Sequence, residues 1–411
     1  MIRHIITGSL VFLFVFSGFA FSQDDEDDIP TGRLIGSENT LKYSVPFLTI
    51  APDSRAGAMG DAGVATPPDV NSLHWNPSKY AFAEKDMGIS LSYTPWLKNL
   101  VDDIHLAYLT GYQRLDRQQV ISGSLLYFSL GNIIFRNEFG DFEGQHTPNE
   151  FAIDAAYSRR FSERFSGGIA FRYIRSDLTG NGHAGGSNIE YEAGNSVAAD
   201  VSMYYRNPGI SVLDKDMDFS FGLNIRNIGN KISYTTEKEN FIPTTMKLGT
   251  AFDFHLDEYN SLMFTTDLNK LLVPTPPAYE VDELGNPVTD ENGDRIIVSG
   301  MNPNVSVPQG MIQSFYDAPG GLEEELHEIK YSFGLEYWYQ DVFAVRSGYF
   351  HEHQNKGNRK YFTMGMGLKL NVFQADFAYL IPRYQNHPLA NTIRFTLVLD
   401  FAALTSDQQG N

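Results

Sequence analysis

Residues 219–226 read FSFGLNIR and alternate apolar with polar side chains over their whole length. Successive residues of a β-strand point to opposite faces, so the two phenylalanines, the leucine and the isoleucine share one face. The same alternation recurs at residues 196–206 and 392–401. The pattern predicts strands that are apolar on one side and polar on the other.

Segments of this kind repeat along the chain after residue 86, each about ten residues long, as a tilted membrane strand requires. We count fourteen, beginning near Met87, Ile104, Gln119, Phe151, Arg164, Ser196, Asp218, Thr244, Leu262, Ile329, Val342, Arg359, Val372 and Asn391. Long connections at 131–150, 176–195, 229–243 and 271–328 alternate with short ones and with two moderate ones, at 208–217 and 256–261. A soluble sandwich shows similar strands but has no reason to gather its long loops at one end.

The sequence therefore predicts an all-β fold, a 14-stranded antiparallel transmembrane β-barrel over residues 87–401. The even strand count places both termini in the periplasm and the long loops outside the cell. Aromatic residues at 204–205 and 337–339 fit a girdle at the membrane interface, although strands are rich in aromatic residues generally. Residues 402–411 form a C-terminal tail.

The N-terminus has the features of an export signal. Residues 1–22 carry Arg3, an apolar stretch and a small-x-small cleavage site, which predicts a signal peptide. Residues 23–44 include the acidic run DDEDD and are expected to be flexible. No later apolar stretch is long enough for a spanning helix.

Composition excludes several classes of function. The chain has no cysteine, so disulfides and thiolate chemistry are ruled out, and no cofactor is expected. Its formal net charge of -19 argues against nucleic-acid binding, which needs basic surfaces.

The most distinctive motif precedes the first strand. Residues 53–66 read DSRAGAMGDAGVAT, and residues 71–77 read NSLHWNP. Small residues allow close packing and a proline fixes a bend, so residues 45–86 could form a hatch inside the barrel, or a periplasmic extension. The motif residues are Asp53, Arg55, Gly57, Met59, Gly60, Asp61, Gly63, Trp75, Asn76 and Pro77.

Two other motifs resemble metal sites. Residues 290–294 begin like a calcium loop but lack its later glycine and glutamate, so a surface turn is expected. His351, Glu352 and His353 lie in a short predicted surface connection with no third ligand evident, so a solvated loop is expected. The sequence predicts no metal site.

The connection at 271–328 is longer than a functionless loop usually is. Its apolar residues predict a partner-binding surface, although the loop could instead fold over its own barrel mouth. The candidate binding residues are Met301, Val305, Val307, Met311, Ile312, Phe315 and Tyr316.

The motif at residues 53–66, the preceding VPFL (45–48) and the HWNP at 74–77 resemble the PorV (LptO) family of FadL-like barrels. These are outer-membrane proteins of the type IX secretion system of Bacteroidetes. The resemblance implies that the chain binds the C-terminal signal domains of secreted cargo. It would take cargo from a SprA-like translocon barrel and carry it to a PorU-like attachment complex, within outer-membrane lipid.

Two alternatives remain. A FadL-like channel for long-chain fatty acids or other hydrophobic solutes predicts an apolar pocket within the barrel and a lateral gap in its wall. A lipopolysaccharide O-deacylase predicts a Ser/His or Asp/His pair at the outer leaflet. His183, His351, His353 and His387 lie in predicted surface connections, but nothing singles one out. We therefore expect no enzyme.

Overall fold

A computed structural model describes residues 39–97, 103–136, 139, 142–178, 182–183, 190–212, 215–235, 239–282, 288–383, 389 and 392–401. All lie in one compact unit, Glu38–Asn411. The predicted signal peptide (1–22), most of the acidic segment (23–38), the tail (402–411) and His387 lie outside the described residues. No helix among the described residues is long and apolar enough to cross a membrane.

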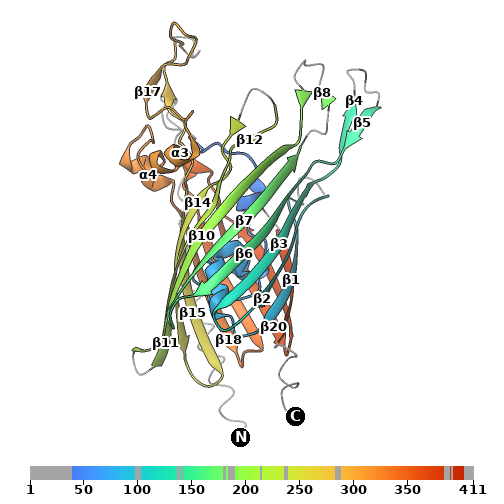
Figure 1. Cartoon of the computed structure of the whole chain (residues 1–411), viewed down its shortest axis with the longest axis vertical. Coiled ribbons are helices and arrows are strands. Elements are labelled where there is room, and N and C mark those ends of the chain that lie inside the picture. Colours follow the sequence, from blue (N-terminus) through green and yellow to red (C-terminus); the bar gives the residue numbers. More distant parts are fainter. Residues whose placement is uncertain are drawn as a thin grey trace. The chain divides into compact units, whose positions relative to one another are not determined.

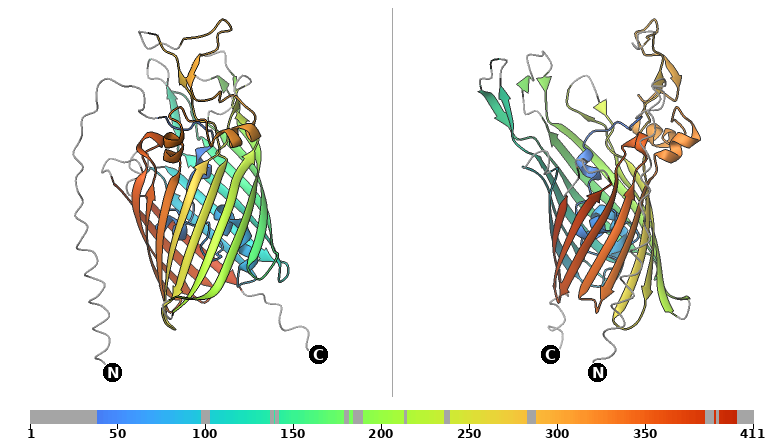
Figure 2. Two further views of the ribbon diagram at one scale, coloured as in Figure 1. Left: turned by 90° about the vertical axis from the view of Figure 1, so that its left-hand side faces the viewer. Right: turned by 180° about the vertical axis from the view of Figure 1, so that it is seen from behind.

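Fourteen antiparallel strands close into a barrel, in which each strand pairs with its neighbours and β1 pairs with β22 (Figures 1 and 2). The strands are β1 (Met87–Pro95), β2 (Ile104–Arg114), β3 (Gln119–Leu130), β6 (Asn149–Arg160), β7 (Phe165–Asp177), β10 (Gly194–Val212), β11 (Lys215–Gly229), β14 (Thr245–His255), β15 (Asn260–Leu271), β18 (Lys330–Tyr339), β19 (Phe343–His351), β20 (Lys360–Leu370), β21 (Phe373–Pro382) and β22 (Ile393–Phe401). All fourteen predicted segments are confirmed, and each begins within three residues of its predicted start.

The long connections gather at one end of the barrel, here called the loop end, and the short ones at the other, the turn end (Figure 1). Four long connections carry small hairpins: β4 (Ile133–Arg136) with β5 (Phe142–His146), β8 (Gly182–His183) with β9 (Glu190–Tyr191), β12 (Ile232–Ser233) with β13 (Glu239–Asn240), and β16 (Ala278–Tyr279) with β17 (Ile297–Ser299). The last connection also contains helices α3 (Val307–Gln313) and α4 (Leu322–His327). A short η3 (Gln354–Lys356) lies between β19 and β20.

The moderate connection predicted at 208–217 is wrong, because β10 continues to Val212 and β11 begins at Lys215. Pro208 cannot donate to a strand ladder, but a register shift between Asn207 and Ile210 accommodates it. Gly209 adopts φ +70° there, and its N–H donates to the Asp218 carboxylate at 2.9 Å instead.

The barrel wall reverses the polarity of a soluble protein. In β1, Ile89, Leu91 and Tyr93 face outward and are 45%, 54% and 47% exposed. Ser90 and Ser92, between them, are buried toward the interior. Apolar side chains outside and polar ones inside are what a barrel surrounded by lipid requires.

The predicted aromatic girdle is wrong in part. Tyr204 is buried inside the barrel, where its hydroxyl donates to Ser220 at 2.9 Å. Trp338 also faces inward, with the Arg346 guanidinium 5.3 Å from its ring. Alternation along a strand sends neighbouring aromatics to opposite faces, so a run of aromatics cannot all meet the membrane.

Residues 45–83 lie inside the barrel, where Figure 2 shows their short helices between the strands. These helices are η1 (Pro46–Thr49), α1 (Ser54–Ala58), α2 (Ser72–Trp75) and η2 (Pro77–Phe82). Their apolar residues pack against inward side chains of the wall. One such cluster joins Phe47 and Leu48 to Leu106, Tyr108 and Ile174. We call residues 45–83 the hatch.

Candidate functional site

The hatch begins with a capped helix. Asp53 accepts hydrogen bonds from the backbone N–H of Ala56 at 3.0 Å and from Trp75 Nε1 at 2.6 Å. The first bond caps α1, and the second joins the two halves of the hatch motif. Burial, and then the nearby Asp69, raise the pKa of Asp53 to about 6.

Arg55 ties the hatch to the wall. Its guanidinium donates to both carboxylate oxygens of Glu336, at 3.0 and 2.7 Å, and to Asp69 at 2.9 Å. Glu336 also accepts from Arg346 Nε at 2.6 Å, and Arg346 pairs with Asp376 at 2.6 Å. Alternating charges thus compensate one another across the interior, which buried ions require.

Two glycines of the motif lie where a side chain has no space. Gly60 adopts φ +68°, and a Cβ there would approach the Tyr349 backbone to 2.6 Å. A Cβ on Gly63 would lie 2.5 Å from the Trp75 ring. The backbone N–H groups of Gly63 and Val64 both donate to Asp267, at 2.8 and 3.0 Å. The small residues therefore let the hatch backbone bind the wall directly.

The end of the motif is anchored in the same way. Asn76 Nδ2 donates to the carbonyls of Val64 and Met203, at 3.1 and 3.0 Å. The Pro77 carbonyl accepts from Ser158 Oγ at 2.7 Å. Of the ten predicted motif residues, Asp61 is half-buried and the other nine are buried. The structure gives these residues a packing and anchoring role within the barrel.

The connection between β15 and β18 stands on a buried ionic cluster. Lys270 donates to Glu325 at 2.9 Å and to Glu328 at 2.7 Å. Lys356, from the β19–β20 connection, donates to Glu328 at 3.0 Å and to Glu324 at 2.5 Å. These contacts fix α4 to the rim of the barrel at the loop end.

Helix α4 places its side chains in an unusual way. It turns Glu325 inward and presents Leu322 and Leu326 to solvent, at 75% and 52% exposure. The preceding helix, α3, and the turn after it expose Ile312, Phe315 and Tyr316. We call these five residues the apolar loop surface.

The prediction for this loop was incomplete. Of the seven predicted residues, Met301, Ile312, Phe315 and Tyr316 are exposed, whereas Val305, Val307 and Met311 are half-buried. Val305 and Val307 pack against a cluster formed by Phe241, Leu271 and Val273. Leu322 and Leu326 were missed, although leucines beside three consecutive glutamates at 323–325 were a signal for a helix with separate apolar and acidic faces.

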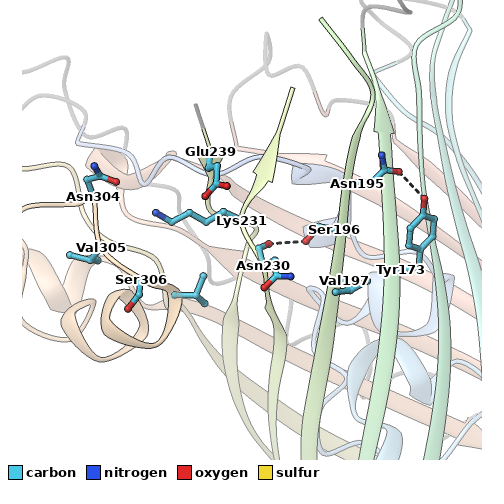
Figure 3. A pocket seen from close by; sticks show the side chains of 11 residues that line it. Tyr173, Asn195, Ser196, Val197, Asn230, Lys231, Glu239, Asn304, Val305 and Ser306 are labelled. Carbon is cyan, nitrogen blue, oxygen red and sulfur yellow. Dashed lines mark hydrogen bonds between the residues drawn. The ribbon is translucent and has the colours of Figure 1, made fainter. Parts of the chain in front are cut away.

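An open groove of about 710 Å³ lies beside this loop (Figure 3). One side is formed by residues 304–307 and the other by β7, β10 and the β12–β13 hairpin. Its lining is mostly polar and uncharged, with amide and hydroxyl groups beside one exposed and two half-buried valines. The lining residues are Tyr173, Asn195, Ser196, Val197, Asn230, Lys231, Glu239, Asn304, Val305, Ser306 and Val307.

The expected solvated loop at His351–His353 is wrong for its central residue. Glu352 is buried and pairs with Lys330 at 2.9 Å and with Arg359 at 2.7 Å. Burial opposes its ionisation, but these two cations outweigh burial and lower the pKa of Glu352 to about 2. The His353 ring stacks on His327 of α4 with centroids 3.6 Å apart.

Other predicted sites have simpler outcomes. The segment 290–294 forms a surface turn, in which Asp290 accepts from the N–H groups of Asn292 and Asp294. His183 lies in strand β8 of a loop-end hairpin. Among the residues that the structure describes, no group of three or more metal-ligating side chains is gathered.

The lipid-type exterior, the polar interior and the buried hatch define a transmembrane β-barrel of the outer-membrane class. The chain belongs to the family described as "Type IX secretion system protein PorV", whose model matches residues 35–278. It is therefore an outer-membrane component of the type IX secretion system.

Solved structures with some similarity include the toluene transporter TodX of Pseudomonas putida, with 11% identity over 88% of this chain and 98% of that one and a TM-score of 0.48. Others are the toluene transporter TbuX of Ralstonia pickettii (10% identity, 86% and 98% coverage, TM-score 0.45) and a Pseudomonas aeruginosa FadL homologue (10% identity, 88% and 100% coverage, TM-score 0.41). No curated protein matches the chain.

Proposed function

We propose that this protein binds the C-terminal signal domain of secreted cargo at its loop end and carries the cargo from the translocon to the attachment complex. In this role the loop end faces the cell exterior and both termini lie in the periplasm. The partners are a SprA-like translocon barrel and a PorU-like attachment complex, with outer-membrane lipid around the wall.

The arrangement of α4 is the observation that carries the proposal. A helix at a protein surface normally buries its leucines and exposes its glutamates. Here Glu325 is 5% exposed and Leu322 is 75% exposed. Exposing apolar surface is unfavourable in water, so its presence on a firmly held helix indicates a surface that a partner covers.

The groove adds a second kind of contact. Side-chain amides and hydroxyls along its two sides can exchange hydrogen bonds with a polypeptide, while Val197, which is 55% exposed, offers apolar contact. An apolar surface beside a polar groove suits a folded domain with an extended segment. Cargo must also be released, and such polar contacts favour moderate affinity over permanent association.

The hatch argues against a channel for hydrophobic solutes. Trp75, Tyr80 and Lys79 are among the largest fully buried side chains, and all three belong to the hatch. A path for fatty acids would have to displace them. The proposed role needs reversible binding and no catalysis, so we propose no deacylase activity.

The test is binding of a purified cargo signal domain to the full chain in detergent, measured by microscale thermophoresis. The variant combines Ile312→Ser, Phe315→Ser and Leu322→Ser, and each removed contact is worth about 1 kcal/mol or more at an interface, so affinity should fall at least tenfold. The control combines Leu115→Ser with Phe161→Ser, which lie in exposed turn-end connections. The proposal would be overturned if the loop-end variant bound cargo as tightly as the natural protein does. It would also be overturned if both variants lost affinity equally.

A further inference from the structure

A second cavity lies inside the barrel, between the hatch and the wall. Its volume is about 50 Å³, and it is separate from the groove at the rim. The wall contributes residues of β11, β14, β15, β18 and β19, and the hatch contributes residues that include η1 and α2. The lining residues are Leu48, Thr49, Ala51, Asp61, Trp75, Arg226, Asn227, Thr245, Lys247, Asn269, Leu271, Lys330, Phe350 and Arg359.

Positive charge dominates this lining. Arg226, Lys247, Lys330 and Arg359 face the cavity, and Asp61 is the one carboxylate among the described residues that line it. One oxygen of Asp61 accepts from the Tyr361 hydroxyl at 2.5 Å, and the other has no hydrogen-bond partner but lies 3.4 Å from Arg394 in an ion pair. Lys330 and Arg359 are neutralised by Glu352, outside the lining.

The other two cations are less completely neutralised. Arg226 is 3% exposed, and its Nε has no hydrogen-bond partner; it forms only a long ion pair with Asp200, at 3.6 Å. Within the described part of the chain, Lys247 forms no hydrogen bond or ion pair with another side chain. Its ammonium lies 4.7 Å from the Trp75 ring, a contact that only partly offsets the loss of water.

His74 of the hatch lies close to the same positive charges. Its Nε2 lies 3.2 Å from Arg226 Nη1, and because a guanidinium can only donate, Nε2 is the acceptor. The ring is therefore neutral. Burial, and then the charges of Arg226, Lys247 and Arg172, lower the pKa of His74.

We propose that this cavity is a binding site for a small oxyanion, of the phosphate or carboxylate type, held by Lys247 and Arg226. A buried cation without a counterion is costly, and a charge-assisted hydrogen bond to an oxyanion removes that cost. One water needs about 10–15 Å³ of such volume, so the cavity holds a small anion and not an acyl chain. The anion would contact both hatch and wall and so hold the hatch in place. This site does not depend on the proposed cargo binding.

Isothermal titration of inorganic phosphate into the full chain in detergent tests the site. We expect saturable binding by the natural protein, at least about tenfold weaker binding by Lys247→Met because a charged hydrogen-bonding partner is lost, and recovery in Lys247→Arg. The matched control is Lys369→Met, which removes a lysine that lines the interior at the turn end. Heat-modifiable migration on gels shows that each variant has kept its barrel.

Two comparisons sharpen the result. Dihexanoyl phosphatidic acid carries the same phosphate group on a lipid. If inorganic phosphate binds at least as tightly as this lipid does, the site is assigned to a free anion. If the lipid binds more tightly and Lys247→Met weakens that binding, the oxyanion site is supported and is assigned to a lipid head group. Absence of phosphate, acetate and lipid binding, or equal affinity in folded Lys247→Met and Lys369→Met, would overturn the proposal.

Discussion

Replacing Glu328 by glutamine should make α4 open from the barrel rim more often without unfolding the barrel. Glu328 is 1% exposed and accepts from Lys270 at 2.7 Å, Thr275 Oγ1 at 2.7 Å and Lys356 at 3.0 Å. Removing one member of a buried ion pair costs about 3–5 kcal/mol, because the remaining charge stays buried and uncompensated. In the variant, Lys270 retains its ion pair with Glu325 and Lys356 retains its ion pair with Glu324. The lower value, about 3 kcal/mol, therefore applies.

That magnitude sets the size of the measured effect. At about 1.4 kcal/mol per factor of ten, local opening of α4 becomes roughly a hundredfold more frequent. Hydrogen exchange followed by mass spectrometry measures this opening at two backbone N–H groups. That of Glu325 donates to the Gly321 carbonyl, and that of residue 328 donates to the Glu325 carbonyl. The control is Glu323→Gln, the same chemical change at an exposed position of α4. Equal exchange in the two variants would refute the reasoning.

Three further predictions concern the hatch, the rim and the interior. Gly63→Ala should lower stability by about 1–3 kcal/mol, because its Cβ would meet the Trp75 ring, whereas Gly144→Ala, with open space around it, should change the melting temperature little. The pKa of Glu352 is lowered from 4.5 to about 2, so its stabilisation of the rim is present above pH 4.5 and is lost as pH falls toward 2. Exchange of the β19–β20 connection, corrected for intrinsic rates, should therefore rise over that range in the natural protein and stay flat in Glu352→Gln. The natural protein should show no steady ion conductance in planar bilayers, and a sustained open current would show that the hatch leaves a path.

The barrel was largely predictable because its signal is local. Each strand carries its own alternation, as residues 219–226 do, and the period of two needs no knowledge of distant residues. The failure at 208–217 has a local cause too. Pro208 and Gly209 normally mark a turn, but here a bulge absorbs them within one long hairpin.

The contacts of the hatch could not be predicted, since they depend on where the closed barrel places distant residues. Arg55 pairs with Glu336, 281 residues away in the chain. The sequence indicated that the motif packs closely, but not which wall residues it meets. The need for glycine at residue 60 likewise depends on the Tyr349 backbone opposite it.

The candidate binding surface was partly predictable for the same reason. Composition located the apolar loop, but the direction of each side chain follows from the buried ionic cluster. Because Lys270 attracts Glu325 and Lys356 attracts Glu324, this side of α4 faces inward and the leucines at 322 and 326 turn outward. Neither lysine lies within the loop, so the loop sequence alone could not show this orientation.

The central claim is that cargo binds at the loop end, and site-specific photo-crosslinking in the native host tests it most directly. A photoreactive phenylalanine analogue replaces Tyr316 at the loop end or Tyr259 in the β14–β15 connection at the turn end, two tyrosines that are 60% and 55% exposed. We predict that the analogue at position 316 crosslinks to the C-terminal domains of secreted proteins and that the analogue at position 259 does not. Cargo crosslinked only from position 259, or equally from both positions, would contradict the account.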